Sequence, residues 1–141
     1  MSRVFFDAMM FAYVLGDNTE FAPHVQRTLE RCYERGDTLL TSCLAVGEVM
    51  VGGEQDREVA SRARAVIRGM GFSLVPFDES CIVAFARLRA EMRLKAPDAI
   101  HLACAAAAKT DLFLTNDGQL LQRRLVVPGI QFIGDFTKSW L

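Results

Sequence analysis

The sequence has 141 residues, of which 51% are hydrophobic and 23% are charged. This length and composition fit one globular domain with its own core, and they exclude a disordered or fibrous chain. Sixteen Lys and Arg against seventeen Asp and Glu give a net charge of −1, which excludes a strongly basic nucleic-acid clamp and an acidic tail. An enzyme that acts on nucleic acid remains possible, because its site can itself require acidic residues.

We expect neither a membrane span nor a signal peptide. The longest apolar candidate, residues 103–108, is far shorter than the roughly 20 residues that a span needs. The apolar stretch 4–15 is interrupted by Asp7 and is followed by no small-residue cleavage site. The cysteines form no C-x-x-C pair, so buried thiols are expected rather than disulfides or a zinc knuckle. These features predict a cytoplasmic protein.

Strands and helices alternate along the chain, because short apolar runs are separated by stretches with apolar residues at helical spacing. In chain order we predict a strand at 4–6, helices at 9–15 and 21–35, a strand at 38–41, helices at 43–51 and 56–70, a strand at 72–75, helices at 80–93 and 97–109, a strand at 112–115, a helix at 118–124 and a strand at 130–133. This alternation predicts an α/β fold with a mainly parallel sheet.

Turn and capping residues predict where the helices begin and end. Asn18 or Thr19 is expected to cap the helix at 21–35, and Gly52 with Gly53 is expected to end the helix at 43–51. The helix at 80–93 has an amphipathic pattern. Its inward-facing residues are expected to be Ile82, Phe85, Ala86 and Leu88.

Acidic residues follow the predicted strands where an open parallel sheet binds its ligands, beyond the carboxyl ends of the strands. Asp7 comes directly after the first strand, and Asp117 lies two residues beyond the end of the fourth. Glu48 lies well inside the helix after the second strand, and Asp98 lies in the first turn of a later helix.

Each of these acids also has a purely structural interpretation. Asp7 and Asp117 could be turn or capping residues, and Asp98 could simply complement the helix dipole. Glu48 is harder to explain in this way, because it lies inside the apolar stretch 44–51 and an acid is rarely buried without a partner. Convergence of all four at one edge would make a site.

Four carboxylates at one edge would repel each other strongly. Two that lie ~6 Å apart repel by about 3 kcal/mol at an effective dielectric constant of about 20, and four carboxylates make six such pairs. Such a cluster needs protons or a cation. Oxygen ligands without His or Cys suit Mg²⁺ or Mn²⁺ rather than Zn²⁺, and the matching chemistry is metal-assisted hydrolysis of a phosphodiester.

Four segments of the sequence together resemble a known family. They are VFFD at 4–7, TSCLAVGEV at 41–49, KAPDAIHLA at 95–103 and LTNDGQL at 114–120. In this order they resemble the PIN domain, and most closely the VapC-like toxin nuclease of bacterial type II toxin–antitoxin pairs. The resemblance implies a three-layer α/β/α fold with four or five mainly parallel strands, formed as a single domain by residues 1–141. It also implies an endoribonuclease that depends on Mg²⁺ or Mn²⁺.

The resemblance also implies which residues act. The expected catalytic, metal-binding acids are Asp7, Glu48, Asp98 and Asp117, and the expected supporting residues are Thr115, Asn116 and His101. The expected partners are an RNA substrate, a separate antitoxin that lies across the active-site groove, and a second copy of the chain in a homodimer. The helices at 43–51 and 56–70 resemble the region that the antitoxin grips.

One departure from the family pattern leaves an alternative open. The family usually has Ser or Thr and then Asn or Ser after the first acid, whereas this chain has Ala8 and Met9. Loss of such outer-shell groups typically affects activity or metal affinity about 10–100-fold. The alternative is a catalytically weakened PIN scaffold that binds RNA or protein.

Three further points stay open. His101 shares a helix face with Asp98, where it could be structural or a general base. The arginine-rich stretches 57–68 and 87–95 could be solvated helix faces or a phosphate-binding rim. A phosphoryl-transfer enzyme of another doubly wound class is disfavoured, because such a phosphatase would need Asp at position 9 and no Walker-type loop is present.

Overall fold

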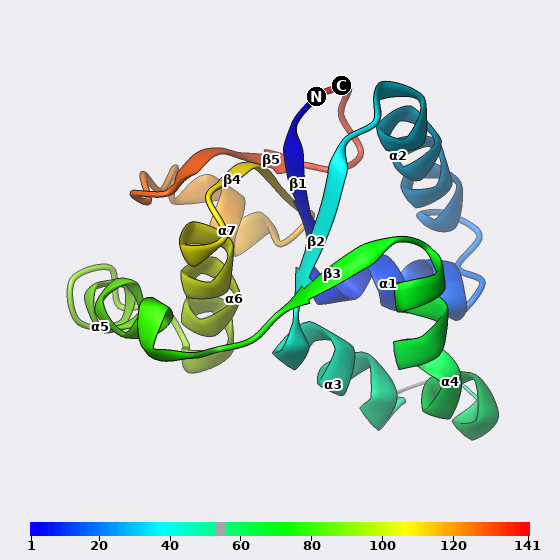
Figure 1. Ribbon diagram of the computed structural model, residues 1–141, viewed down its shortest axis with the longest axis horizontal. Helices are drawn as coiled ribbons and strands as arrows, with labels where there is room; N and C mark the ends of the chain where they lie inside the picture. The colour runs from blue at the N-terminus through cyan, green and yellow to red at the C-terminus, as the bar shows by residue number, and fades with distance from the viewer. Residues whose placement is uncertain (53–55) are drawn as a thin grey trace.

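Five short strands form one parallel sheet in the order β3-β2-β1-β4-β5 (Figure 1). They are β1 (Arg3–Phe6), β2 (Thr38–Ser42), β3 (Phe72–Val75), β4 (Thr110–Thr115) and β5 (Ile130–Asp135). The computed structural model describes residues 1–52 and 56–141. The central residues of β1, β2 and β4 are apolar and buried because both faces of the sheet are covered by helices.

Helices cover the sheet in two layers (Figure 1). The first layer consists of α1 (Ala8–Leu15), α2 (Ala22–Arg35), α3 (Cys43–Val51) and α4 (Arg57–Gly69). The second layer consists of α5 (Ile82–Ala90), α6 (Ala96–Ala107) and α7 (Gly118–Gln122). A short 3-10 turn, η1 (Glu79–Cys81), precedes α5. Successive strand residues serve opposite layers: Phe6 packs with the first and Phe5 with the second. The predicted three-layer α/β/α fold is confirmed.

The strand order creates a switch point beside β1. The chain adds β2 and β3 on one side of β1 and then crosses over to add β4 and β5 on the other side. Phe6 at the end of β1 pairs with Leu114 near the end of β4. The residues that follow these two strands therefore meet at the crevice where open α/β sheets bind ligands.

The predicted strands agree with the structure to within two residues, but the start of one helix differs. Helix α2 begins at Ala22 with Phe21 as its N-cap, and Asn18 instead closes the preceding turn by accepting hydrogen bonds from the amides of Glu20 and Phe21. Helix α3 ends at Val51 with Gly52 as its C-cap, as predicted, and the φ of Gly52 is +102°; Gly53 lies outside the described residues.

The helix predicted at 80–93 is shorter and rotated. It consists of η1 and α5 and ends at Ala90, and Ile82 is 53% exposed. The buried face instead begins at Cys81, one residue before Ile82, and includes Leu88, which lies seven residues after Cys81 on the same side of the helix. The prediction that Ile82 and Ala86 face inward was therefore wrong. Within the described residues, no helix combines the length and apolar character needed to cross a bilayer.

The aromatic cluster beneath the first helix layer gives a test of the fold. Phe72 is 4% exposed and contacts the rings of Phe6 and Phe11 at centroid distances of 4.9 and 4.8 Å. Phe72→Ala should lower the free energy of unfolding by about 3–5 kcal/mol in urea titration, because it leaves a cavity in the core. Phe132→Ala, at a 56% exposed position on β5, is the control and should change it by less than about 1 kcal/mol. Equal losses would contradict this packing.

Candidate functional site

A pocket of about 280 Å³ opens where β1 and β4 end. Its acidic lining is Asp7, Glu48, Asp98 and Asp117. These residues come from the end of β1, from α3, from the first turn of α6 and from the turn after β4. The structure thus brings all four sequence-predicted acids to one pocket, together with His101.

Thr115 connects two of these acids. Its hydroxyl donates to Asp7 Oδ2 at 2.7 Å and accepts the backbone N–H of Asp117 at 3.1 Å. Asp7 Oδ1 also accepts from the amide of Ala8 at 2.8 Å, so this carboxylate is held at both oxygens. Thr115 is fully buried, which fixes its rotamer and the spacing of the two acids.

Asp117 and Asp98 occupy helix starts, but they differ in their hydrogen bonding. Asp117 Oδ1 caps α7 by accepting from the amides of Gln119 and Leu120. The Asp98 carboxylate accepts no hydrogen bond from any described residue. Burial raises its pKa, and the negative charges of Asp117 and Asp7 raise it further. Asp98 is therefore the acid that the pocket leaves least compensated.

Glu48 is positioned by a buried histidine. Its side chain is 42% exposed, so the expectation that it is a buried acid was wrong, but it has the partner that such an acid needs. His101 Nε2 lies 2.7 Å from Glu48 Oε1, and its Nδ1 lies 2.7 Å from the Ser42 hydroxyl. A carboxylate only accepts, so Nε2 carries the proton and donates to Glu48, and Nδ1 then accepts from Ser42.

Ser42 is a site residue that sequence reasoning missed. The sequence identifies it as a possible helix start, and its hydroxyl indeed accepts the Ala45 amide of α3 at 2.9 Å. The same hydroxyl also holds His101, which lies 59 residues away in the chain. Only the packing of α6 against β2 and α3 makes this second contact visible.

The remaining predicted residues lie as follows. Asn116 donates from Nδ2 to the hydroxyl of Tyr13 at 3.1 Å and is not among the described residues that line the pocket. Ala8 and Met9 do line it, so apolar atoms stand where the family pattern has polar side chains. The wall beside Asp7 therefore offers fewer hydrogen-bonding groups.

The donor chemistry of the pocket fits a divalent cation. Within residues 1–52 and 56–141, no three His, Cys, Asp or Glu side chains are arranged to hold a metal ion as they stand. Caps hold oxygens of Asp7 and Asp117, and Glu48 is turned toward His101, so joint ligation requires side-chain rotation. Four carboxylates nevertheless supply the hard oxygen ligands that Mg²⁺ and Mn²⁺ prefer, and Asp98 has both oxygens available.

Residues 4–125 match the PIN domain family. The chain belongs to this family. Among curated proteins, none matches the sequence significantly.

Solved structures share the PIN fold with this chain. VapBC2 from Rickettsia felis, bound to a DNA fragment from its promoter, matches with a TM-score of 0.73 and 14% identity over 94% of this chain and 97% of that one. DNA-bound VapBC from Salmonella typhimurium matches with a TM-score of 0.68 and 18% identity, and the match covers 96% of this chain and 99% of that one. VapBC-1 from nontypeable Haemophilus influenzae matches with a TM-score of 0.70 and 14% identity, and the match covers 96% of this chain and 98% of that one. At these identities the likeness shows the fold alone.

The raised pKa of Asp98 predicts a pH dependence of stability. The folded PIN domain binds this proton more tightly than the unfolded chain, so ionised Asp98 destabilises it as pH rises from the ordinary Asp range through the raised pKa. In urea titrations with EDTA, Asp98→Asn should become increasingly more stable than wild type over that rise. Asp78→Asn should show the opposite sign, because hydrogen bonds from Ser80 lower the pKa of Asp78. Parallel curves for wild type and Asp98→Asn would contradict the assignment.

The double role of Ser42 predicts a stability loss. Ser42→Ala removes the cap of α3 and the partner of buried His101, so the free energy of unfolding should fall by about 1–3 kcal/mol. Ser61→Ala, at an exposed position on α4, is the matched control and should change it by about 0.5 kcal/mol or less. Thermal and urea unfolding measure both variants, and equal losses would remove the proposed link to His101.

Proposed function

We propose that this protein is an endoribonuclease that depends on Mg²⁺ or Mn²⁺ and hydrolyses RNA phosphodiester bonds. The observation that carries the proposal is the convergence of Asp7, Glu48, Asp98 and Asp117 on one pocket at the switch point of a PIN fold. Four like charges in one pocket are tolerable with a divalent cation, and a phosphodiester is the substrate whose hydrolysis such a cation assists.

In this proposal Asp7, Asp98 and Asp117 hold the principal cation, and Glu48 completes the site. When bound, the cation supplies a Lewis acid that polarises the phosphoryl oxygen and activates water. Thr115 fixes the oxygens of Asp7 through its hydroxyl. His101 directs Glu48 through Oε1, which leaves Oε2 to accept a proton from the attacking water.

We further propose that the chain is the toxin of a toxin–antitoxin pair, which acts in the cytoplasm as a homodimer. Membership of the PIN family and the shared fold with VapBC proteins from three bacteria support this. The partner is then a separate antitoxin chain that covers the acidic pocket. Helix α3 lines that pocket through Glu48 and Val49, and α4 packs against α3, so this helix pair offers the surface for the antitoxin.

One observation supports a second candidate function. Ala8 and Met9 make the pocket wall apolar beside Asp7, so the cation is held by fewer outer-shell groups. A scaffold that binds RNA or protein without cutting RNA is the alternative. Calorimetric titration with Mn²⁺ separates the two: undetectable binding at millimolar Mn²⁺ favours the scaffold.

Cleavage of a structured RNA transcript tests the proposal directly. Wild type should cut it with Mg²⁺ or Mn²⁺ and not with EDTA. Asp98→Asn should reduce cleavage by at least the roughly 10–100-fold that loss of an outer-shell partner costs, because a ligand is removed. Asp78→Asn, an exposed Asp outside the pocket, should cut as wild type does. Equal cleavage by wild type and Asp98→Asn would refute the mechanism.

A further inference from the structure

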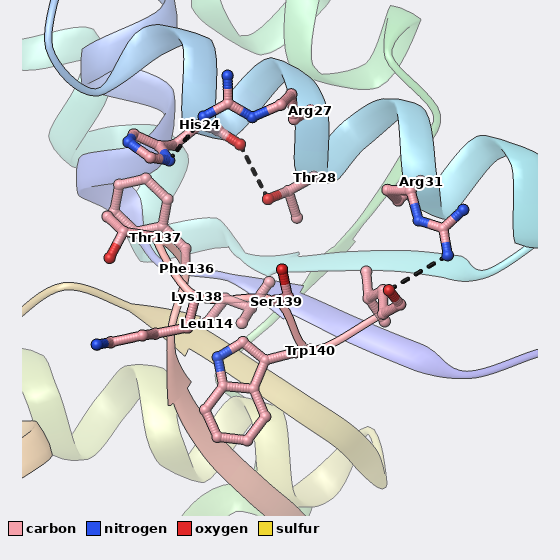
Figure 2. Close-up of a pocket in the computed structure, with 11 residues that line it drawn as sticks. His24, Arg27, Thr28, Arg31, Leu114, Phe136, Thr137, Lys138, Ser139 and Trp140 are labelled. Carbon is pink, nitrogen blue, oxygen red and sulfur yellow. Dashed lines mark hydrogen bonds between the residues drawn. The ribbon is translucent and has the colours of Figure 1, made fainter.

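A second pocket lies between α2 and the C-terminal residues 136–141 (Figure 2). It has a volume of about 340 Å³, and none of its described lining side chains is acidic. Four basic side chains line it: His24, Arg27, Arg31 and Lys138. Its chemistry is thus opposite to that of the acidic pocket.

The pocket is built by one helix face and a folded-back tail. His24, Arg27 and Arg31 lie at spacings of three and four residues, so they share one face of α2 (Figure 2). The tail is fastened opposite them, because Trp140 Nε1 donates to the carbonyl of Asp135 at 2.7 Å. The indole also packs directly on Gly134, where any Cβ would collide with the ring.

The positive charge of this pocket is largely uncompensated. Arg27 donates to His24 Nδ1 at 3.0 Å, because a guanidinium only donates, and this leaves Nε2 as the ring nitrogen with a donor to offer. Among the described residues, Arg27 and Lys138 form no ion pair with a carboxylate. Arg31 is shared between Glu34 and the carbonyl of Leu141. Two cations and a ring N–H are therefore available to an anion.

Trp140 adds a second kind of contact. Its indole is 45% exposed although its N–H is satisfied, so part of the ring surface is free for stacking. Cations and an exposed aromatic ring that line one pocket are the combination that binds single-stranded nucleic acid, with phosphates at the cations and a base on the ring. An acidic peptide would use the cations but leave the indole unused.

A short chain of side chains connects the two pockets. The Phe136 ring lines the basic pocket and lies 6.0 Å from the ring of Tyr13. The hydroxyl of Tyr13 bonds to Asn116, the neighbour of Asp117 in the acidic pocket. Phe136 N also donates to the carbonyl of Thr115 at 3.0 Å. Contacts therefore run from Phe136, in the wall of the basic pocket, to Thr115 and Asn116 beside Asp117.

We propose that the pocket between α2 and the tail binds the sugar–phosphate backbone of single-stranded RNA whose scissile bond lies in the acidic pocket. Arg27 and Lys138 neutralise its phosphates, and one base stacks on Trp140. This rests on the proposed function. It also gives that function what the acidic pocket lacks, since carboxylates repel a polyanion and the chain as a whole has a net charge of −1.

RNA binding without cleavage tests this proposal. Fluorescence anisotropy of a labelled 12-nucleotide single-stranded RNA is measured with the full chain in EDTA. Each phosphate contact with a single strand adds about 0.7 to the slope of log affinity against log salt concentration. At 0.1 M salt this corresponds to roughly a fivefold gain in affinity per contact. The double variant Arg27→Gln, Lys138→Gln should therefore bind roughly 25-fold more weakly and lose about 1.4 of the salt slope. Arg124→Gln, Lys109→Gln is the matched control, with the same change of charge at two exposed positions outside both pockets, and should bind as wild type does.

The single Trp of the chain reports on the pocket itself. The RNA should quench Trp140 fluorescence in wild type and in the control, and should quench it far less in the Arg27 and Lys138 variant. Inorganic pyrophosphate should compete weakly, since it lacks a base. Quenching by polyglutamate but not by RNA would overturn the proposal, as would RNA binding that the double variant does not change.

Cleavage assays with Mn²⁺ separate this inference from the proposed function. If wild type cuts RNA and the double variant binds and cuts as well as the control, the pocket assignment is wrong and the nuclease stands. If wild type does not cut, but RNA still quenches Trp140 and the double variant abolishes this, the nuclease fails and the pocket stands.

Discussion

The mutual repulsion of carboxylates at the switch point is the constraint on which the acidic pocket depends. The fold brings Asp7 and Asp117 to the ends of two neighbouring strands, and the buried hydroxyl of Thr115 holds both. Burial raises the pKa of Asp98, and the negative charges of Asp117 and Asp7 raise it further. The protein thus maintains an unfavourable electrostatic arrangement, which is typical of functional sites rather than of structural caps.

One side of the acidic pocket is hydrogen-bonded and the other is mainly apolar. On one side, the buried Ser42 hydroxyl is hydrogen-bonded to the buried His101 ring, and His101 in turn is hydrogen-bonded to Glu48. The orientation of Glu48 is therefore set by a side chain that is shielded from solvent. On the other side, Ala8 and Met9 offer only apolar side chains, although the Ala8 amide donates to Asp7. The proposed site is therefore supported asymmetrically, with most of its hydrogen bonds on the side of α3 and α6 and at Thr115.

Charge is also divided between two regions of the surface. The arginines of α4 and α5 were candidates for a phosphate-binding rim, but several of them serve local contacts. Arg62 pairs with Glu58, and Arg57 donates to the carbonyls of Met50 and Val51. Arg27 and Lys138, at α2 and the C-terminal tail, carry no motif, and among the described residues neither forms an ion pair. Counting arginines along the sequence cannot show which cations already have a partner.

The sequence by itself determined the strand–helix alternation, because buried parallel strands are short apolar runs, and it identified the four acids. Asp7 and Asp117 follow strands within two residues, whereas Glu48 and Asp98 lie within helices and were assigned to the site through the family's segments. It also contained Ser42, Arg27, Lys138 and Trp140, but not their roles. Those roles depend on how distant segments come together: Ser42 contacts His101 only when α6 packs on the sheet, and Lys138 lines the same pocket as Arg27 only when the tail turns back. Periodicity records which face of an element is buried, whereas the partner across that face is decided by tertiary packing.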